Sequence, residues 1–189
     1  GKFALEPMKG PWDTPVAATA SGLKPATQYD LVWTTGKAQW KLSEDRSKYV
    51  GREARTVEQL LQKITTDAAG AFKATFTVPR GFGYAHDVQV VDDAKMIRNK
   101  SIFEVDMVTT ITPTSGPVGT PITIEVKGIG YQSYQNSFQL TYDNKYTGWV
   151  SSITTDGYAK FTIPATGNPG VHIITLGHSE FGAPYMNPN

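Results

Sequence analysis

The sequence contains no cysteine among its 189 residues, and this absence excludes disulfide bonds and thiolate metal sites. No apolar run approaches the roughly 20 residues that span a bilayer, so we expect no membrane insertion. The formal net charge is only +1, which gives no general electrostatic reason to bind nucleic acid. We find no phosphate-binding loop, EF-hand or nucleophile motif, and we therefore expect a non-enzymatic protein without a metal or cofactor.

The sequence does contain a segment that occurs twice. Leu5–Val16 reads L-E-P-M-K-G-P-W-D-T-P-V, and Ile111–Ile122 reads I-T-P-T-S-G-P-V-G-T-P-I. The two segments align at a constant offset of 106 positions. One kind of domain therefore occurs in two copies, at residues 1–106 and 107–189, and each is close to the size of an immunoglobulin sandwich.

Large apolar residues alternate with polar ones in both copies, which is typical of half-buried β-strands. Ile122, Ile124 and Val126 form one such row in copy two. From the alternation before Pro79 and Pro164 we predict that Phe76 and Phe161 are buried at equivalent positions. The fold class is predicted to be all-β, with two tandem immunoglobulin-like antiparallel β-sandwiches and almost no regular helix.

Each copy has one distinctive feature. In copy one, residues 36–58 form an insertion with a dense mix of charges, which we interpret as an exposed loop or hairpin. Copy one is then predicted to close with a turn over 92–100 and a last strand over 101–106. In copy two, residues 179–189 contain two prolines and no β-branched run, so the last strand looks incomplete. That strand is degenerate, was cut off or is supplied by another chain.

The opening of copy two, with its Gly-x-Gly-aromatic turn, closely resembles that of the IPT/TIG family, whose tandem immunoglobulin-like domains occur in bacterial or archaeal surface proteins. The residues that carry the resemblance are Pro113, Gly116, Pro117, Gly119, Ile122, Gly128, Gly130 and Tyr131. The resemblance covers roughly residues 108–176 and is weaker over 5–92, where Trp12-Asp13 replaces Val-Gly. It implies an immunoglobulin-like fold and a non-catalytic role at the cell surface, and it implies no particular activity.

Aromatic side chains are the main candidates for a contact surface, because flat rings suit a protein partner or a sugar ring. The candidates are Trp12, Trp40, Trp149, Tyr131, Tyr134 and Tyr146, with core or inter-domain packing as the alternative. Phe181 and Tyr185 are candidate anchors of an assembly edge next to the incomplete strand. Asn99 begins a glycosylation sequon within the predicted turn. His86 and His172 stand at equivalent places in the two copies, which favours a structural hydrogen bond over a metal site.

These observations favour a non-catalytic extracellular or cell-surface protein with a structural or adhesive role. Its expected partners are copies of itself, in a surface filament or layer, or neighbouring domains of a longer surface protein. The alternative is a carbohydrate-binding accessory module of a secreted enzyme, for which the partner would be a polysaccharide. The chain opens on Gly1, as a processed protein or a fragment would.

Overall fold

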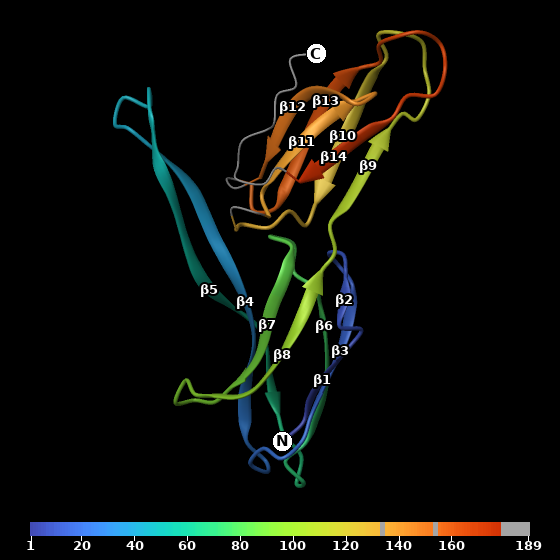
Figure 1. The fold of residues 1–189 in the computed structure, drawn as a ribbon. Helices are drawn as coiled ribbons and strands as arrows, with labels where there is room; N and C mark the ends of the chain where they lie inside the picture. The colour runs from blue at the N-terminus through green and yellow to red at the C-terminus, as the bar shows by residue number, and fades with distance from the viewer. Residues whose placement is uncertain (133–134, 153–154, 179–189) are drawn as a thin grey trace. The chain divides into compact units, whose positions relative to one another are not determined.

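The computed structural model describes residues 1–132, 135–152 and 155–178, and every regular element in them is a β-strand (Figure 1). The first half contains β1 (Phe3–Glu6), β2 (Lys9–Gly10), β3 (Pro15–Ala20), β4 (Gln28–Leu42), β5 (Tyr49–Thr65), β6 (Phe72–Thr77), β7 (Tyr84–Val91) and β8 (Ile97–Val105). The second half contains β9 (Val108–Thr112), β10 (Pro121–Lys127), β11 (Ser137–Tyr142), β12 (Lys145–Ser151), β13 (Tyr158–Pro164) and β14 (Ile174–His178). The predicted all-β class is confirmed. The described residues include no helix long and apolar enough to cross a membrane.

Each copy is built from two sheets with an immunoglobulin-like order of strands. In copy one the orders are β1-β3-β6 and β2-β8-β7-β4-β5, and in copy two they are β13-β10-β9 and β12-β11-β14. Copy two therefore repeats the pattern of copy one with β9, β10 and β13 in place of β1, β3 and β6. The short strand β2 departs from the antiparallel prediction, since Lys9 and Gly10 pair parallel to Glu104 and Val105.

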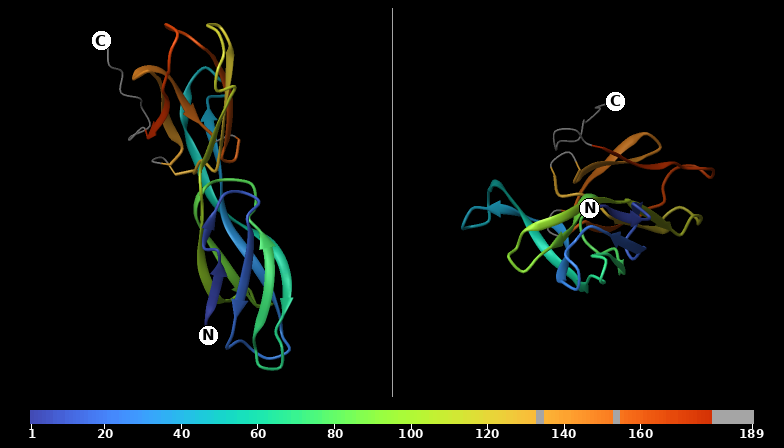
Figure 2. Two further views of the ribbon diagram at one scale, coloured as in Figure 1. Left: turned by 90° about the vertical axis from the view of Figure 1, so that its right-hand side faces the viewer. Right: turned by 90° about the horizontal axis from the view of Figure 1, so that it is seen from below.

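In each copy the strands form two sheets that face each other (Figures 1 and 2). The inward-facing side chains form a separate apolar core in each copy. The core of copy one is centred on fully buried side chains such as Trp33, Val88 and Phe103. The core of copy two is centred on Ile124 and Phe138 in the same way. Burial of aromatic and branched residues on one face of every inner strand provides the main driving force for this fold.

The repeated G-P-x-x-T segment has a physical explanation that is the same in both copies. Thr14 Oγ1 donates to the carbonyl oxygen of Pro11 at 2.7 Å, and Thr120 Oγ1 donates to that of Pro117 at 2.7 Å. The threonine side chain packs over the preceding glycine, where a Cβ on Gly10 would lie 2.7 Å from Thr14 Oγ1. A Cβ on Gly116 would lie closer still to Thr120. Glycine and threonine are therefore required together to close this turn.

The register of the strands corrects the prediction that Phe76 and Phe161 are equivalent. Phe76 pairs with Val16, whereas Phe161 pairs with Ile124, which corresponds in the repeat to Ala18. Phe76 is only 8% exposed, while Phe161 is half-buried at the margin of its core. The prediction failed because β6 ends before Pro79, whereas β13 continues to Pro164. Alternation of apolar and polar residues does not reveal this shift in register.

The end of copy one also differs from the sequence-based expectation. The last strand, β8, begins at Ile97 instead of residue 101, and the turn is confined to the residues just before it. Asp92 fixes that turn, because its carboxylate accepts from the backbone N–H of Met96 at 2.8 Å and forms an ion pair with Arg98. The expected incomplete last strand of copy two falls on residues 179–189, which lie outside the described residues.

Residues 36–58, predicted as an inserted loop or hairpin, form the outer part of a long β-hairpin. β4 pairs with β7 only over Asp30–Trp33, so the rest of β4 continues with β5 beyond the other strands of its sheet (Figure 1). The chain divides into two compact units. The first contains residues 1–37 and 54–106, and the second contains the hairpin residues 38–53 together with 107–189.

Candidate functional site

The outer part of the β4–β5 hairpin carries several large apolar side chains, which we call the hairpin patch. It consists of the half-buried Trp40 and the exposed Leu42, Tyr49 and Val50. Tyr49 and Val50 are consecutive on β5, so they lie on opposite faces of the hairpin. Leu42 is 51% exposed, Tyr49 64% and Val50 65%. The rings of Trp40 and Tyr49 meet edge-on with centroids 5.6 Å apart, a geometry that aromatic pairs favour. Of the predicted contact residues, Trp40 is the one that the structure places here.

Polar interactions surround the hairpin patch and stiffen its turn. Lys41 and Glu53 form an ion pair at 3.6 Å across the two strands. Asp45 accepts from the backbone N–H of Ser47 at 3.0 Å and from the hydroxyl of Ser43 at 2.5 Å. The Ser43 hydroxyl, followed by the Ser47 groups, lowers the pKa of Asp45 to about 2. An apolar centre inside a polar margin is the usual composition of a protein interface.

A second exposed surface lies on the outer face of the β12-β11-β14 sheet and contains Tyr146 and Trp149. These residues are three apart, and a regular strand would place them on opposite faces. A β-bulge after Leu140 in the β11–β12 pairing brings both onto the face opposite the core, across from Thr141 and Gln139. Tyr146 is 36% exposed and Trp149 is 44% exposed. The sequence suggested both aromatics, but it carried no sign of the bulge that brings them together.

The remaining predicted contact residues do not join either surface. Trp12 is half-buried and packs against the core of copy one. Tyr131 is half-buried, and its carbonyl oxygen accepts from the Asn136 side chain at 3.0 Å. The other three candidates, Tyr134, Phe181 and Tyr185, lie outside the described residues.

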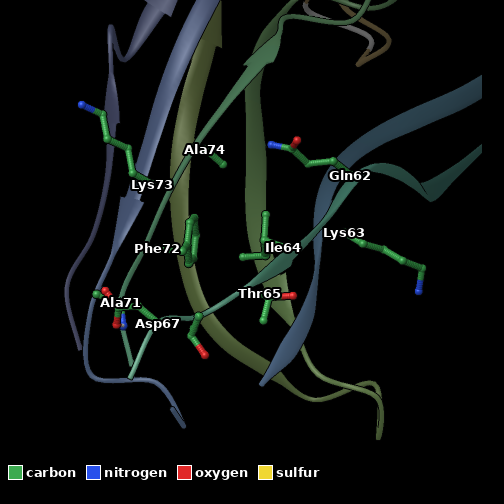
Figure 3. A pocket seen from close by; sticks show the side chains of 10 residues that line it. Gln62, Lys63, Ile64, Thr65, Asp67, Ala71, Phe72, Lys73 and Ala74 are labelled. Carbon is green, nitrogen blue, oxygen red and sulfur yellow. Dashed lines mark hydrogen bonds between the residues drawn. The ribbon is translucent and has the colours of Figure 1, made fainter. Parts of the chain in front are cut away.

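Shallow depressions occur where the two sheets of each copy meet at the sandwich edge. In copy one, a cavity of about 650 Å³ lies between β5 and β6, where Ile64 and Phe72 point inward and Lys63 and Lys73 point away (Figure 3). In copy two, the corresponding depression between β12 and β13 has a volume of about 530 Å³ and includes Trp149. The presence of the same depression in both copies indicates a property of the sandwich edge, so neither depression by itself identifies a ligand.

The two histidines perform the structural role that their equivalent positions predicted. His86 stacks on Trp33 at 4.5 Å, and its Nε2 lies 2.8 Å from the carbonyl oxygen of Phe82, four residues earlier. His172 packs against Tyr142 at 5.3 Å, and its Nε2 lies 2.8 Å from the carbonyl oxygen of Asn168, again four residues earlier. Both imidazoles therefore tie a loop to the strand that follows it.

The second ring nitrogen distinguishes the two histidines. Nδ1 of His86 lies 3.0 Å from the carbonyl oxygen of Thr34, and burial lowers the pKa of this imidazole despite its hydrogen bonds. Nδ1 of His172 lies 2.5 Å from the carboxylate of Asp143, which raises the pKa of His172. No three metal-ligating side chains gather anywhere in the part of the chain that the structure describes.

The end of the copy-two sandwich contains a hollow of about 520 Å³, which we call the end hollow. Its walls come from the G-P-x-x-T turn and from the loop before β14. The lining includes Ile111, Ile122, Tyr142, Ala165, His172 and Ile174. No sequence pattern predicts this hollow, because it is the space that segments distant in the chain leave unfilled.

Asn99, the sequon residue, lies inside strand β8 and not in the predicted turn. It pairs with Val90 in the β7–β8 ladder and is half-buried. A glycosylated asparagine needs an exposed site, so this position is less accessible than the sequence suggested.

No family model and no curated protein matches the chain. Solved structures that overlap it include a Salmonella alpha-2-macroglobulin reacted with methylamine, at 15% identity over 82% of this chain, with a TM-score of 0.34. Another is an Escherichia coli alpha-2-macroglobulin activated by porcine elastase, at 12% identity over 89% of this chain, with a TM-score of 0.33. The chain spans 11% and 21% of the lengths of those proteins. At these TM-scores the likeness carries no weight for function.

Proposed function

We propose that this chain is a non-catalytic structural module of an extracellular or cell-surface protein, and that it associates with further copies of itself through the hairpin patch. The observation that carries this proposal is that three large apolar side chains near the end of one hairpin, Leu42, Tyr49 and Val50, are each more than half exposed. Adjacent exposed apolar side chains mark interaction sites in soluble proteins. The IPT/TIG resemblance of residues 108–176 adds support for a non-catalytic role, because domains of that family are almost always non-catalytic.

The hairpin also provides backbone groups for assembly. Among the described strands, β5 is the edge strand of the β2-β8-β7-β4-β5 sheet, and it has a neighbouring strand on one side only. Edge strands pair readily with strands of another chain. The exposed apolar side chains of the hairpin patch and the edge of β5 therefore both favour a contact with another polypeptide chain.

The test compares a patch variant with a matched control in sedimentation velocity over a range of concentrations. We expect the full chain to associate as its concentration rises, and the double variant Tyr49→Ser, Val50→Ser to sediment as a monomer. The control is Leu60→Ser, which replaces a residue that is 51% exposed on the same strand, outside the hairpin patch. A wild-type chain that stays monomeric, or a patch variant that associates unchanged, would contradict the proposal.

A second function, binding of a polysaccharide, is favoured by the outer face of the β12-β11-β14 sheet. Tyr146 and Trp149 lie on that face next to the amide of Gln139 and the hydroxyl of Thr141, as a sugar platform of rings and polar groups requires. Opposite Gln139 on β14 stands Gly177, which adds no side chain to this face.

Affinity electrophoresis in gels that contain a soluble polysaccharide tests this second function. We expect the polysaccharide to retard the chain, Trp149→Ala to abolish the retardation, and Trp40→Ala to leave the retardation unchanged.

A further inference from the structure

The outer face of the β12-β11-β14 sheet is arranged in two rows of side chains that cross the three strands. The first, which we call the open row, consists of Trp149 on β12, Gln139 on β11 and Gly177 on β14. The second, which we call the filled row, consists of Tyr146, Thr141 and Thr175 on the same three strands. Each row begins with an aromatic ring on β12, and the two rows differ at β14.

Gly177 leaves open space at the far end of the open row. The residue is exposed, and a Cβ added to it would meet no atom within 4 Å. It lies within β14 and is not one of the glycines with positive φ. The backbone at this position would therefore accept a side chain, and backbone conformation does not explain the glycine.

Copy one has a side chain at the corresponding place. Asp30–Trp33 pairs with Val88–Val91 in copy one, and Gln139–Tyr142 pairs with Ile174–Gly177 in copy two. The two ladders have the same register, so Val91 is the counterpart of the glycine. Val91 is only 5% exposed, which shows that the same position in the other sandwich is filled and covered.

The two outer faces also differ in charge. The counterpart of Gln139 in copy one is Asp30, which forms ion pairs with Lys63 at 3.3 Å and with Lys95 at 3.2 Å. No residue of the open row or the filled row is charged. A face of aromatic rings, hydroxyls and an amide offers no ion pair to an anionic polymer, and it therefore favours a neutral ligand.

The filled row limits the direction in which a bound polymer can extend. The hydroxyls of Thr141 and Thr175 are hydrogen-bonded to each other, so side chains occupy this row from β11 to β14. In the open row, the amide of Gln139 offers both donors and an acceptor, which suits the hydroxyls of a sugar. A chain that stacks on Trp149 therefore finds polar partners and free space along the open row.

We propose that the open row binds an unbranched, neutral polysaccharide whose successive rings are coplanar, the class to which β-1,4-linked glucans belong. One sugar stacks on Trp149, and the chain continues across the strands over Gln139 and Gly177. This inference rests on the polysaccharide binding proposed above as a second function. It adds the class of polymer, the direction of the chain and the residue that admits it.

The length of the open row favours a straight polymer. Neighbouring strands lie about 4.8 Å apart, so the row extends about 10 Å from β12 to β14. A chain of coplanar rings keeps its flat faces on the sheet over this distance, whereas a helical α-glucan curves away from it. A side chain in place of Gly177 would stand in the path of the straight chain, and such a clash is a common source of specificity.

The experiment is affinity electrophoresis of the full chain in gels that contain hydroxyethyl cellulose, a neutral and soluble derivative of a β-1,4-glucan. We expect Gly177→Thr to weaken the apparent affinity about tenfold or more, because the new side chain blocks the path of the polymer. Gly177→Ala presents a smaller obstacle and should weaken the affinity less. Circular dichroism checks that each variant is folded, and Gly177→Ala carries the test if threonine is not tolerated.

The matched control is Gly148→Thr on β12. A Cβ at Gly148 would also meet no atom within 4 Å, but this residue pairs with the buried Leu140 and so lies on the core side of the sheet. Gly148→Thr should therefore be retarded like the wild type. Gels with carboxymethyl cellulose, which is anionic, and with soluble starch, which is an α-glucan, should retard the wild type less than hydroxyethyl cellulose does.

The possible failures are distinct. If Trp149→Ala abolishes retardation while Gly177→Thr is retarded like the wild type, the role of Gly177 is wrong and the polysaccharide platform stands. Equal retardation by carboxymethyl cellulose or starch would contradict the neutral, straight class of polymer. If none of the three polysaccharides retards the wild type, the second function fails and this inference fails with it.

Discussion

At the scale of single residues, the most informative side chains are the two histidines. A neutral imidazole has one N–H, yet both nitrogens of His86 and of His172 face acceptor oxygens. Only protonation would satisfy both acceptors with donors. Burial opposes that protonation at His86, while the Asp143 carboxylate supports it at His172. The same fold position therefore has opposite titration behaviour in the two copies.

This contrast predicts a pH dependence for copy two. The pKa of folded His172 is raised above its unfolded value of about 6.5, so its stabilising effect is fully present below that pH and is lost as the pH rises through the folded pKa. The pKa of Asp143 is lowered, so its contribution is present above about pH 4 and is lost as the pH falls through the folded pKa. Unfolding free energy measured by chemical denaturation should be greatest between these limits.

The matched variants for this prediction are Asp143→Asn and Asp156→Asn. Asp143→Asn removes the carboxylate that faces His172 and should flatten the pH profile on both sides. Asp156 is an exposed turn residue with a positive φ of 48°, a conformation that asparagine also adopts readily. Asp156→Asn should therefore leave the shape of the profile unchanged. Profiles of the same shape for both variants would contradict the role given to the His172–Asp143 pair.

At the scale of elements, the register of neighbouring strands determines which side chains face each other across a sheet. Copy one sets the small Ala20 on β3 against the large Phe72 on β6. Copy two places its larger residues on β10, where Val126 faces Ala159. The larger residue of this cross-strand pair thus lies on β6 in copy one and on β10 in copy two.

This register predicts unequal costs for two phenylalanine truncations. Phe76 is 8% exposed, so Phe76→Ala should reduce the free energy of unfolding of copy one by about 3–5 kcal/mol. Phe161 is half-buried at the margin of its core, so Phe161→Ala should cost copy two less, about 1–2 kcal/mol. Denaturant titration of both variants measures the difference. An equal or larger loss for Phe161→Ala would show that the register of β13 is misassigned.

At the scale of the whole molecule, the cores of the two copies are built from separate sets of residues. Two separate cores favour two unfolding transitions, because each core loses its burial on its own. Calorimetry should resolve them, with Phe76→Ala lowering the temperature of one transition and Ile124→Ala that of the other. Ile124 is fully buried at the centre of copy two and provides the matched core truncation. A single transition shifted equally by both variants would contradict independent cores.

The sequence by itself determined the all-β class, the two copies and the residues that close their shared turn. These features are local: alternation with a period of two, a glycine beneath a threonine, and a histidine at the head of a strand are all contained in short segments. The sequence also identified Trp40 and Trp149 as candidate contact residues, although it did not predict which residues lie beside them. It placed Phe161 and Asn99 wrongly because both positions depend on where a strand begins relative to its partner.

The tertiary structure alone decided which residues meet. The bulge after Leu140 brings Tyr146 and Trp149 onto one face, and the exposure of Tyr49 follows from how far the β4–β5 hairpin continues past its neighbouring strands. The end hollow brings together residues from distant segments, among them Ile111, Tyr142 and His172. Register, bulges and unfilled space are relations between segments distant in the chain, and no pattern within a single segment encodes them.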